Sequence, residues 1–171
     1  MSKKILTITA VIFGTSLLQS TVMDYFVIFK AKPNLLVIVA ISAALLRTDL
    51  NAAFIGLACG LTMDVLIGKA LGWYGIILFL VCFFIGMINS KLYKDNPLIP
   101  VFFVFTSSIV VETLYYMVYY FLKGYDEFLF AFTNLIVPES IYNALLAFPI
   151  YKFVFYLCKK VDKFHYTHSR L

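Results

Sequence analysis

Long apolar runs separated by short polar breaks fill most of the chain, and they predict a bundle of membrane-spanning helices. A span needs about 20 residues to cross the hydrocarbon core of a bilayer. We expect six spans, at about 5–22, 33–49, 50–67, 73–88, 101–122 and 139–157. The second run is short for a full crossing, so it should recruit flanking residues or lie inside the bundle. The stretch at about 123–137 begins polar and turns aromatic, which indicates an interfacial or partly inserted segment.

Prolines mark the points where two of these runs begin. Pro33 opens the second run, and Pro138 opens the sixth. Proline is well tolerated in the first turn of a helix, where its missing N–H would have had no partner. Both prolines therefore receive a structural role in this prediction.

Composition narrows the class of protein further. Of the 171 residues, 63% are apolar and 13% are charged, and the mean hydropathy is +0.93. A soluble domain has about 45–50% apolar and about 25% charged residues. This composition excludes a soluble enzyme domain, a nucleic-acid-binding module and a disulfide-stapled secreted fold. We expect one all-α integral membrane domain over residues 1–171, with no nucleic-acid partner and with membrane lipid around it.

The positions of the basic residues predict the orientation in the membrane. With the N-terminus inside, the inner regions hold nine lysines and arginines and the outer regions hold four. The inner set is Lys3, Lys4, Arg47, Lys91, Lys94, Lys159, Lys160, Lys163 and Arg170, and the outer set is Lys30, Lys32, Lys69 and Lys123. An excess of positive charge marks the cytoplasmic side, so both termini should be cytoplasmic.

A stripe of very small residues carries the first candidate site. It repeats every four residues as Ala52, Gly56, Gly60, Asp64 and Gly68. Such spacing keeps a stripe on one slowly winding helix face, and small residues let membrane helices approach closely. A carboxylate near the bilayer centre is costly and often functional. Two interpretations stay open: a helix-packing groove in which Asp64 is hydrogen-bonded to a neighbouring helix, or a surface that binds a partner or ligand.

A second stripe runs along the fifth span. Glu112 leads Tyr115, Tyr116, Tyr119 and Tyr120, whose spacing places them on one helix face. Tyrosines gather in aromatic belts at membrane interfaces, which is one interpretation. The other is a groove near the outer surface, lined for a ligand or a partner.

The remaining residues give no indication of catalysis. His165 and His168 stand three residues apart in the C-terminal tail, but two ligands without a third are poor evidence for a metal. The three cysteines match no metal or redox spacing. We expect no enzyme activity, no metal and no cofactor.

Several short motifs, taken together and in order, resemble the bacterial rod shape-determining MreD family. They are Leu18-Gln-Ser20, Lys32-Pro-Asn-Leu-Leu36, Ala44-Leu-Leu-Arg47, Ala53-Phe-Ile-Gly56, Gly60-Leu-Thr-Met-Asp64, Gly68 to Gly72, Val137-Pro-Glu-Ser-Ile-Tyr-Asn143 and Pro149. The resemblance covers nearly the whole chain and is most specific over residues 53–72. It gives Asn34 and Asn143 structural roles beside the two prolines. Asn34 departs from the family pattern, which often has aspartate after the proline.

This resemblance implies a non-enzymatic, multi-pass protein of the bacterial cytoplasmic membrane. Members of the family are thought to bind the bitopic protein MreC. With it they would link cytoplasmic MreB filaments to a RodA-type glycosyltransferase and a class B penicillin-binding transpeptidase. The implied fold is similar to the substrate-binding subunits of energy-coupling-factor transporters, which are six-helix proteins with a ligand pocket near the outer side.

Two alternatives from other classes remain. The chain could be a small-molecule-binding subunit of an energy-coupling-factor type vitamin transporter, with Glu112, the tyrosines and the segment 123–137 forming an outward-facing pocket. It could also be an ion channel or a proton-coupled carrier that uses Asp64 and Glu112.

Overall fold

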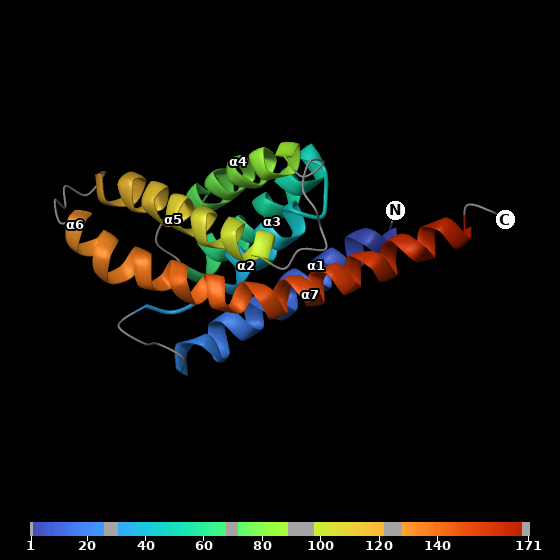
Figure 1. Cartoon of the computed structure of the whole chain (residues 1–171), viewed down its shortest axis with the longest axis horizontal. Coiled ribbons are helices and arrows are strands. Elements are labelled where there is room, and N and C mark those ends of the chain that lie inside the picture. Colours follow the sequence, from blue (N-terminus) through green and yellow to red (C-terminus); the bar gives the residue numbers. More distant parts are fainter. Residues whose placement is uncertain (1, 26–30, 68–71, 89–97, 122–127, 169–171) are drawn as a thin grey trace.

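In a computed structural model of the chain, residues 2–25, 31–67, 72–88, 98–121 and 128–168 are described, and helices account for most of them (Figure 1). The main helices are α1 (Ser2–Thr21), α2 (Leu35–Ala44), α3 (Asp49–Ile67), α4 (Trp73–Ile88), α5 (Leu98–Phe121), α6 (Phe128–Ala131) and α7 (Val137–His168). A short 3-10 helix, η1 (Met23–Tyr25), follows α1, and a π-helical stretch, η3 (Phe132–Ile136), joins α6 to α7. The all-α class expected from the sequence is confirmed.

Helix length and hydropathy support a multi-pass membrane protein. In the described part of the chain, three helical segments are long and apolar enough to cross a membrane: Leu50–Ile67, Leu98–Val118 and Phe128–Lys160. Three further apolar helices are shorter, at Leu6–Thr21, Leu35–Ala44 and Trp73–Ile88. Each of the six expected spans therefore corresponds to an apolar helix, although only half of these helices reach the full crossing length.

The helix α2 forms the centre of the bundle. Its ten residues are all buried, and it contacts α1, α3, α4, α5 and α7. A helix rises 1.5 Å per residue, so ten residues cover about 15 Å, or half of a ~30 Å hydrocarbon core. The second apolar run of the sequence thus lies inside the bundle, which explains why it can be short and apolar on every side.

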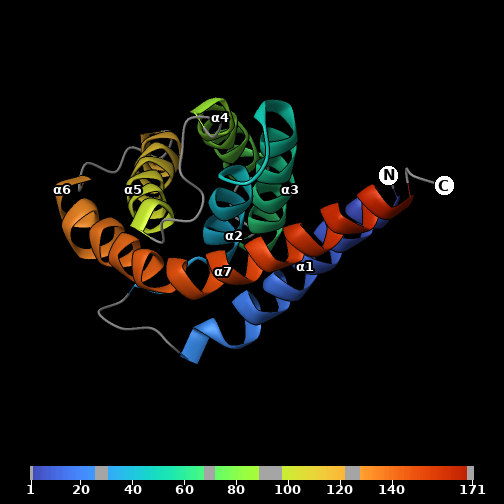
Figure 2. The same cartoon turned by 45° about the vertical axis from the view of Figure 1, so that its right-hand side comes forward.

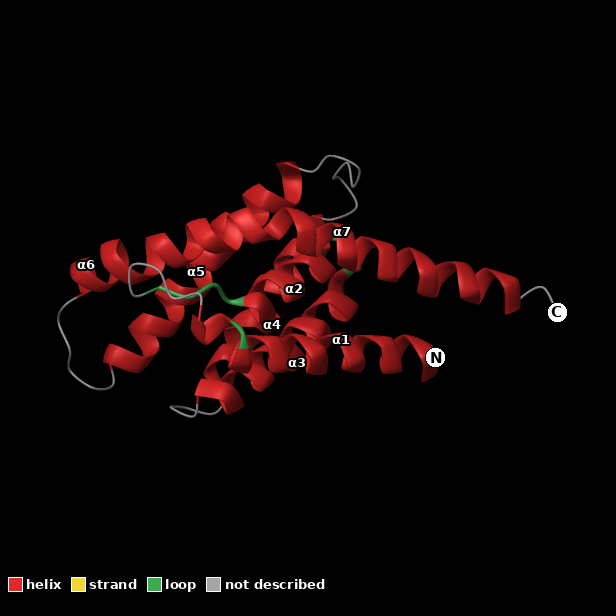
Figure 3. Ribbon diagram, turned by 90° about the horizontal axis from the view of Figure 1, so that it is seen from below, coloured by secondary structure: helices red, strands yellow, loops and turns green. Residues whose placement is uncertain are grey.

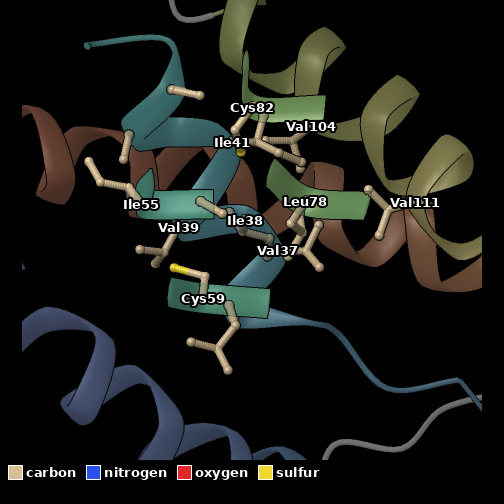
Figure 4. Packing of buried hydrophobic residues seen from close by; sticks show 14 of the residues in the cluster. Val37, Ile38, Val39, Ile41, Ile55, Cys59, Leu78, Cys82, Val104 and Val111 are labelled. Atoms are coloured by element: carbon tan, nitrogen blue, oxygen red, sulfur yellow. The ribbon is translucent and has the colours of Figure 1, made fainter. Parts of the chain in front are cut away.

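The core is built from branched and small side chains around α2 (Figure 4). Val37, Ile38 and Ile41 project from α2 toward the surrounding helices. The neighbours in the same cluster are Ile55 and Cys59 of α3, Leu78 and Cys82 of α4, and Val104 and Val111 of α5. The same cluster also contains Ala147, Tyr151 and Val154 of α7, so it joins five helices.

The helices α3 and α4 form a closely packed hairpin whose contact depends on glycine. A Cβ atom built on Gly56 would lie 2.5 Å from the Leu78 carbonyl oxygen and 2.7 Å from the Cys82 sulfur. A Cβ on Gly60 would collide with the Tyr74 carbonyl oxygen and lie 2.7 Å from the Gly75 Cα. These two members of the small-residue stripe therefore face α4 of the same chain, where the backbones approach closely.

The last helix begins earlier than the sequence indicated. Helical structure is continuous from Phe128 through η3 into α7, so the described part of the segment 123–137 is an extension of this helix. The Val137 N–H bonds to the Phe132 carbonyl, five residues back. This wider turn stands directly before Pro138, which lacks an N–H and whose ring would clash with the carbonyl four residues back in a regular α-helix.

Both chain termini lie at one end of the molecule. The helices α1 and α7 extend toward that end, and α6 lies at the opposite end (Figures 2 and 3). We call the end that contains α6 the distal end. It holds the C-termini of α1 and α3 and the N-termini of α2, α4 and α7.

The glycine contacts yield a test of the hairpin. We expect Gly56→Ala to destabilise the protein by about 1–3 kcal/mol, since overpacking a close contact costs this amount. Gly14→Ala is the matched control, because nothing lies within 4 Å of a Cβ at Gly14 in the middle of α1. Alanine should there leave stability unchanged or raise it slightly. Thermal unfolding of the purified proteins in one detergent measures both, and equal midpoints for the two variants would contradict the packing described above.

Candidate functional site

Buried polar side chains gather at the distal end, and the first of them hold the start of α2. Gln19 of α1 is 3% exposed. Its Nε2 donates to the Pro33 carbonyl oxygen at 3.1 Å, and its Oε1 accepts from the Leu35 N–H at 2.8 Å. The first N–H groups of a helix have no partner within the helix. One glutamine therefore satisfies a donor of α2 and fixes the chain on both sides of Asn34.

Asn34 completes the cap of α2 with help from two other helices. Its Oδ1 accepts from the Val37 N–H at 3.2 Å, as expected of an N-cap asparagine. Its own N–H donates to Oδ1 of Asn143 in α7 at 2.7 Å, and the Nδ2 of Asn143 donates to the Ser108 hydroxyl of α5 at 3.1 Å. The start of α2 is thus tied to α1, α5 and α7 through side chains that are almost fully buried.

Asp64 performs the same task for α4. It is 1% exposed. Its Oδ2 accepts from the N–H groups of Gly72 and Gly75 at 3.0 and 3.1 Å, and its Oδ1 accepts from the Tyr74 N–H at 3.1 Å. A carboxylate at a helix N-terminus also interacts favourably with the helix dipole. Gly72 has a φ of 98°, a left-handed conformation that glycine adopts without strain.

Two further carboxyl groups meet beside the α2 start. The Tyr74 hydroxyl donates to the Glu112 carboxyl, with Oη 2.7 Å from Oε1 and 2.6 Å from Oε2. The Glu139 carboxyl lies next to the Glu112 carboxyl. Helices α4, α5 and α7 thereby meet in one polar cluster.

The amide nitrogen of Asn34 faces this cluster. The Asn34 side chain lies beside both carboxyl groups. Its Nδ2 is buried but makes no hydrogen bond of regular geometry. Since Oδ1 is occupied by the helix cap, Nδ2 is the donor that this side chain has left to offer.

A cavity of about 430 Å³ opens next to the cluster. We call it the distal cavity and define it by its lining residues. These are Gln19, Ser20, Lys32, Asn34, Met63, Leu66, Ile67, Tyr74 and Glu139. One wall is therefore apolar and comes from the end of α3, and the other carries amides, a hydroxyl, a carboxyl and an ammonium. Its volume lies within the ~300–1,000 Å³ typical of small-molecule sites.

The tyrosines of the fifth span do not share one environment. The Tyr115 ring is buried and packs on the Tyr74 ring, with centroids 4.1 Å apart. The Tyr116 ring instead meets Phe128 of α6 at 5.7 Å. The side chain of Tyr119 lies outside the described residues, as does Gly68 of the small-residue stripe.

Sequence reasoning missed several members of the distal cluster. Tyr74 was only one residue of the expected span 73–88, although it contacts Glu112 and lines the cavity. Lys32 was placed only among the outer charges. Gln19 was not missed, because its place at the outer end of the first span indicates a residue that caps or bridges helices, and it caps α2. Polar residues next to prolines or at the ends of spans could have indicated a polar site. Which of them lie close together depends on how the helices pack.

The polar side chains at the distal end hold the starts of α2 and α4 in position. Among the residues that the structure describes, no group of three histidine, cysteine, aspartate or glutamate side chains could hold a metal ion. What the distal end offers is a set of directed donors and acceptors around a half-open cavity.

The cap of α2 yields the second prediction. Asn143→Ala leaves the buried Asn34 N–H without its acceptor, which should cost about 1–3 kcal/mol. Asn134→Ala serves as the control, since Asn134 lies in the same helical segment but is exposed and bonds only to its own turn. Thermal unfolding in detergent should show a lowered midpoint for the first variant and little change for the second. An unchanged midpoint for Asn143→Ala would show that the α2 start does not depend on this bond.

Comparison with known protein families places the chain in one of them. The family model of rod shape-determining protein MreD matches residues 2–161, which is nearly the whole chain. No curated protein and no solved structure matches the chain. The resemblance drawn from the short motifs is therefore confirmed, and it extends beyond the segment 53–72 where the motifs are most specific. The chain belongs to the MreD family of non-catalytic membrane proteins that determine rod shape.

Proposed function

We propose that this chain is a membrane scaffold of the bacterial cell-elongation complex. In this role it binds MreC and helps couple MreB filaments to a RodA-type glycosyltransferase and a class B penicillin-binding transpeptidase. Membership of the MreD family carries the proposal. In this proposal the protein holds other proteins together, and it does so through the shape of its helix bundle.

The distribution of polar and apolar groups supports a scaffold. Gln19, Asp64 and Asn143 direct their hydrogen bonds to backbone groups inside the bundle. Large apolar side chains lie exposed on the outer faces, among them Phe13 of α1, Phe54 of α3 and Phe102 of α5. Membrane helices associate through close packing and scattered polar contacts. Faces of this kind suit lipid and the transmembrane helix of a partner.

The small-residue stripe enters this proposal as a shaping element. Gly56 and Gly60 pack on α4, and Asp64 caps α4. We assign these residues to the geometry of the α3–α4 hairpin, and we expect the partner to bind a surface that the hairpin presents. With the basic residues of the sequence, the proposal places both termini in the cytoplasm, on the side of the MreB filaments.

The alternative role in a vitamin transporter is favoured by one observation, the distal cavity. A fold similar to the substrate-binding subunits of energy-coupling-factor transporters would use a pocket in this place for its vitamin. Such a subunit works only with ATPases and a coupling protein. The two functions therefore differ in the proteins that accompany the chain.

Purification from native membranes separates these functions. We expect the tagged chain, extracted in mild detergent, to recover MreC and the wall-synthesis enzymes, as identified by mass spectrometry. A tagged membrane protein of similar size and unrelated function provides the background. Recovery of transporter ATPases and a coupling subunit without MreC would overturn the scaffold proposal.

Asp64→Asn tests how the stripe contributes. Asparagine keeps one acceptor oxygen but directs an NH₂ group at backbone donors that Asp64 now satisfies. We expect a lower yield of folded protein, with an unchanged amount of MreC recovered per folded molecule. Size-exclusion chromatography gives the folded amount and quantitative mass spectrometry gives MreC. Normal folding with lost MreC would contradict this assignment and make Asp64 a direct contact of the partner.

A further inference from the structure

We propose that the distal cavity binds a zwitterion that carries an ammonium and a phosphate group, the chemistry of an aminophospholipid headgroup. This inference goes beyond the scaffold function and does not depend on the partner. It rests on the position of opposite charges in the cavity, on an unused buried donor, and on an apolar exit toward the membrane.

Opposite charges stand at different depths of the cavity. Lys32 is exposed at the rim, and Glu139 is partly buried and interacts electrostatically with it. Glu112, which does not line the cavity, is held nearby by the Tyr74 hydroxyl. The Glu139 carboxyl can therefore receive an ammonium, and Lys32 can exchange its interaction within the chain for one with an anion.

Asn34 adds a directed donor to this arrangement. The residue is 2% exposed, lines the cavity, and has an Nδ2 without a hydrogen bond of regular geometry. A buried donor that makes no hydrogen bond costs free energy. A phosphate oxygen in the cavity would give Nδ2 an acceptor.

The mixture of charges selects the ligand class. A simple cation would meet Lys32, and a simple anion would meet Glu139, so each would suffer one repulsion. A molecule that carries both signs satisfies both residues.

The apolar wall indicates a lipid source for this zwitterion. Leu66 lines the cavity and is itself 40% exposed, and Val65 and Leu61 of the same helix are 70% and 44% exposed. An acyl chain can therefore leave the cavity along α3 and enter the surrounding bilayer. A free zwitterion of the same chemistry has no use for that exit, which makes the two sources distinguishable.

Lipid retention tests the proposal directly. The full chain is purified in mild detergent, exchanged into mixed micelles of equal phosphatidylethanolamine and phosphatidylglycerol, and measured by native mass spectrometry. We expect one phosphatidylethanolamine to be retained in preference to phosphatidylglycerol. Lys32→Gln and Glu139→Gln should each weaken that retention about tenfold, as expected when a hydrogen bond to a charged group is lost.

Lys152→Gln provides the matched control for the lysine variant. Lys152 is also exposed, and it lies in α7 over the Phe148 ring, away from the cavity. Its removal should leave retention unchanged. Lys32 stands at the rim and outside the helices, so its variant is expected to fold, and thermal unfolding of every variant without added lipid verifies this.

A second arm identifies the source of the ligand. O-phosphoethanolamine is added to the protein in phosphatidylglycerol micelles, and thermal unfolding is recorded. Stabilisation by the lipid alone supports a headgroup site, and stabilisation by O-phosphoethanolamine as well supports a site that takes the free zwitterion. Equal retention of the two lipids, or equal retention by folded Lys32→Gln and wild type, would overturn the proposal.

Discussion

Backbone N–H groups at the start of a buried helix must find acceptors, and the bundle is organised around this requirement. The first N–H groups of α2 and α4 have no partner within their own helices, and most of the residues that carry them are buried. Asp64 satisfies three N–H groups around the start of α4, and Gln19, Asn34 and Asn143 serve the start of α2. Because these acceptors come from different helices, capping one helix also fixes the position of its neighbours.

This requirement explains why polarity is concentrated at one end of the molecule. The short helix α2 begins within the bundle, so its polar caps meet there together with the carboxyls of Glu112 and Glu139. Side chains that are placed for hydrogen bonding leave space between them, and the distal cavity occupies that space. Branched aliphatic residues fill much of the core among the residues that the structure describes. The distal end differs because it brings several buried polar side chains together around a cavity.

Hydrophobic patterning predicted much of the fold because long apolar runs have few structural solutions in a bilayer. The run that contains α2 was expected either to recruit flanking residues or to lie inside the bundle, since ten to fourteen apolar residues are too few for a crossing. The structure has the second arrangement. The α6–η3–α7 helix was harder to foresee. The polar residues before Phe128 in the sequence and Pro138 resemble a break between helices. A π-helical turn accommodates the proline and keeps the helix continuous from Phe128 onward.

The sequence by itself determined the class of protein, the approximate positions of its helices, the family, and the presence of costly carboxylates at Asp64 and Glu112. Tertiary structure decided what those residues do. A glycine stripe has the same spacing whether it meets a partner or its own chain, and only the packing of α3 on α4 shows that Gly56 and Gly60 face inward. Likewise, Glu112 and Glu139 are 27 positions apart, and only the approach of α5 to α7 brings them together. Local pattern carries no information on which helices become neighbours, because this depends on the packing of the whole bundle.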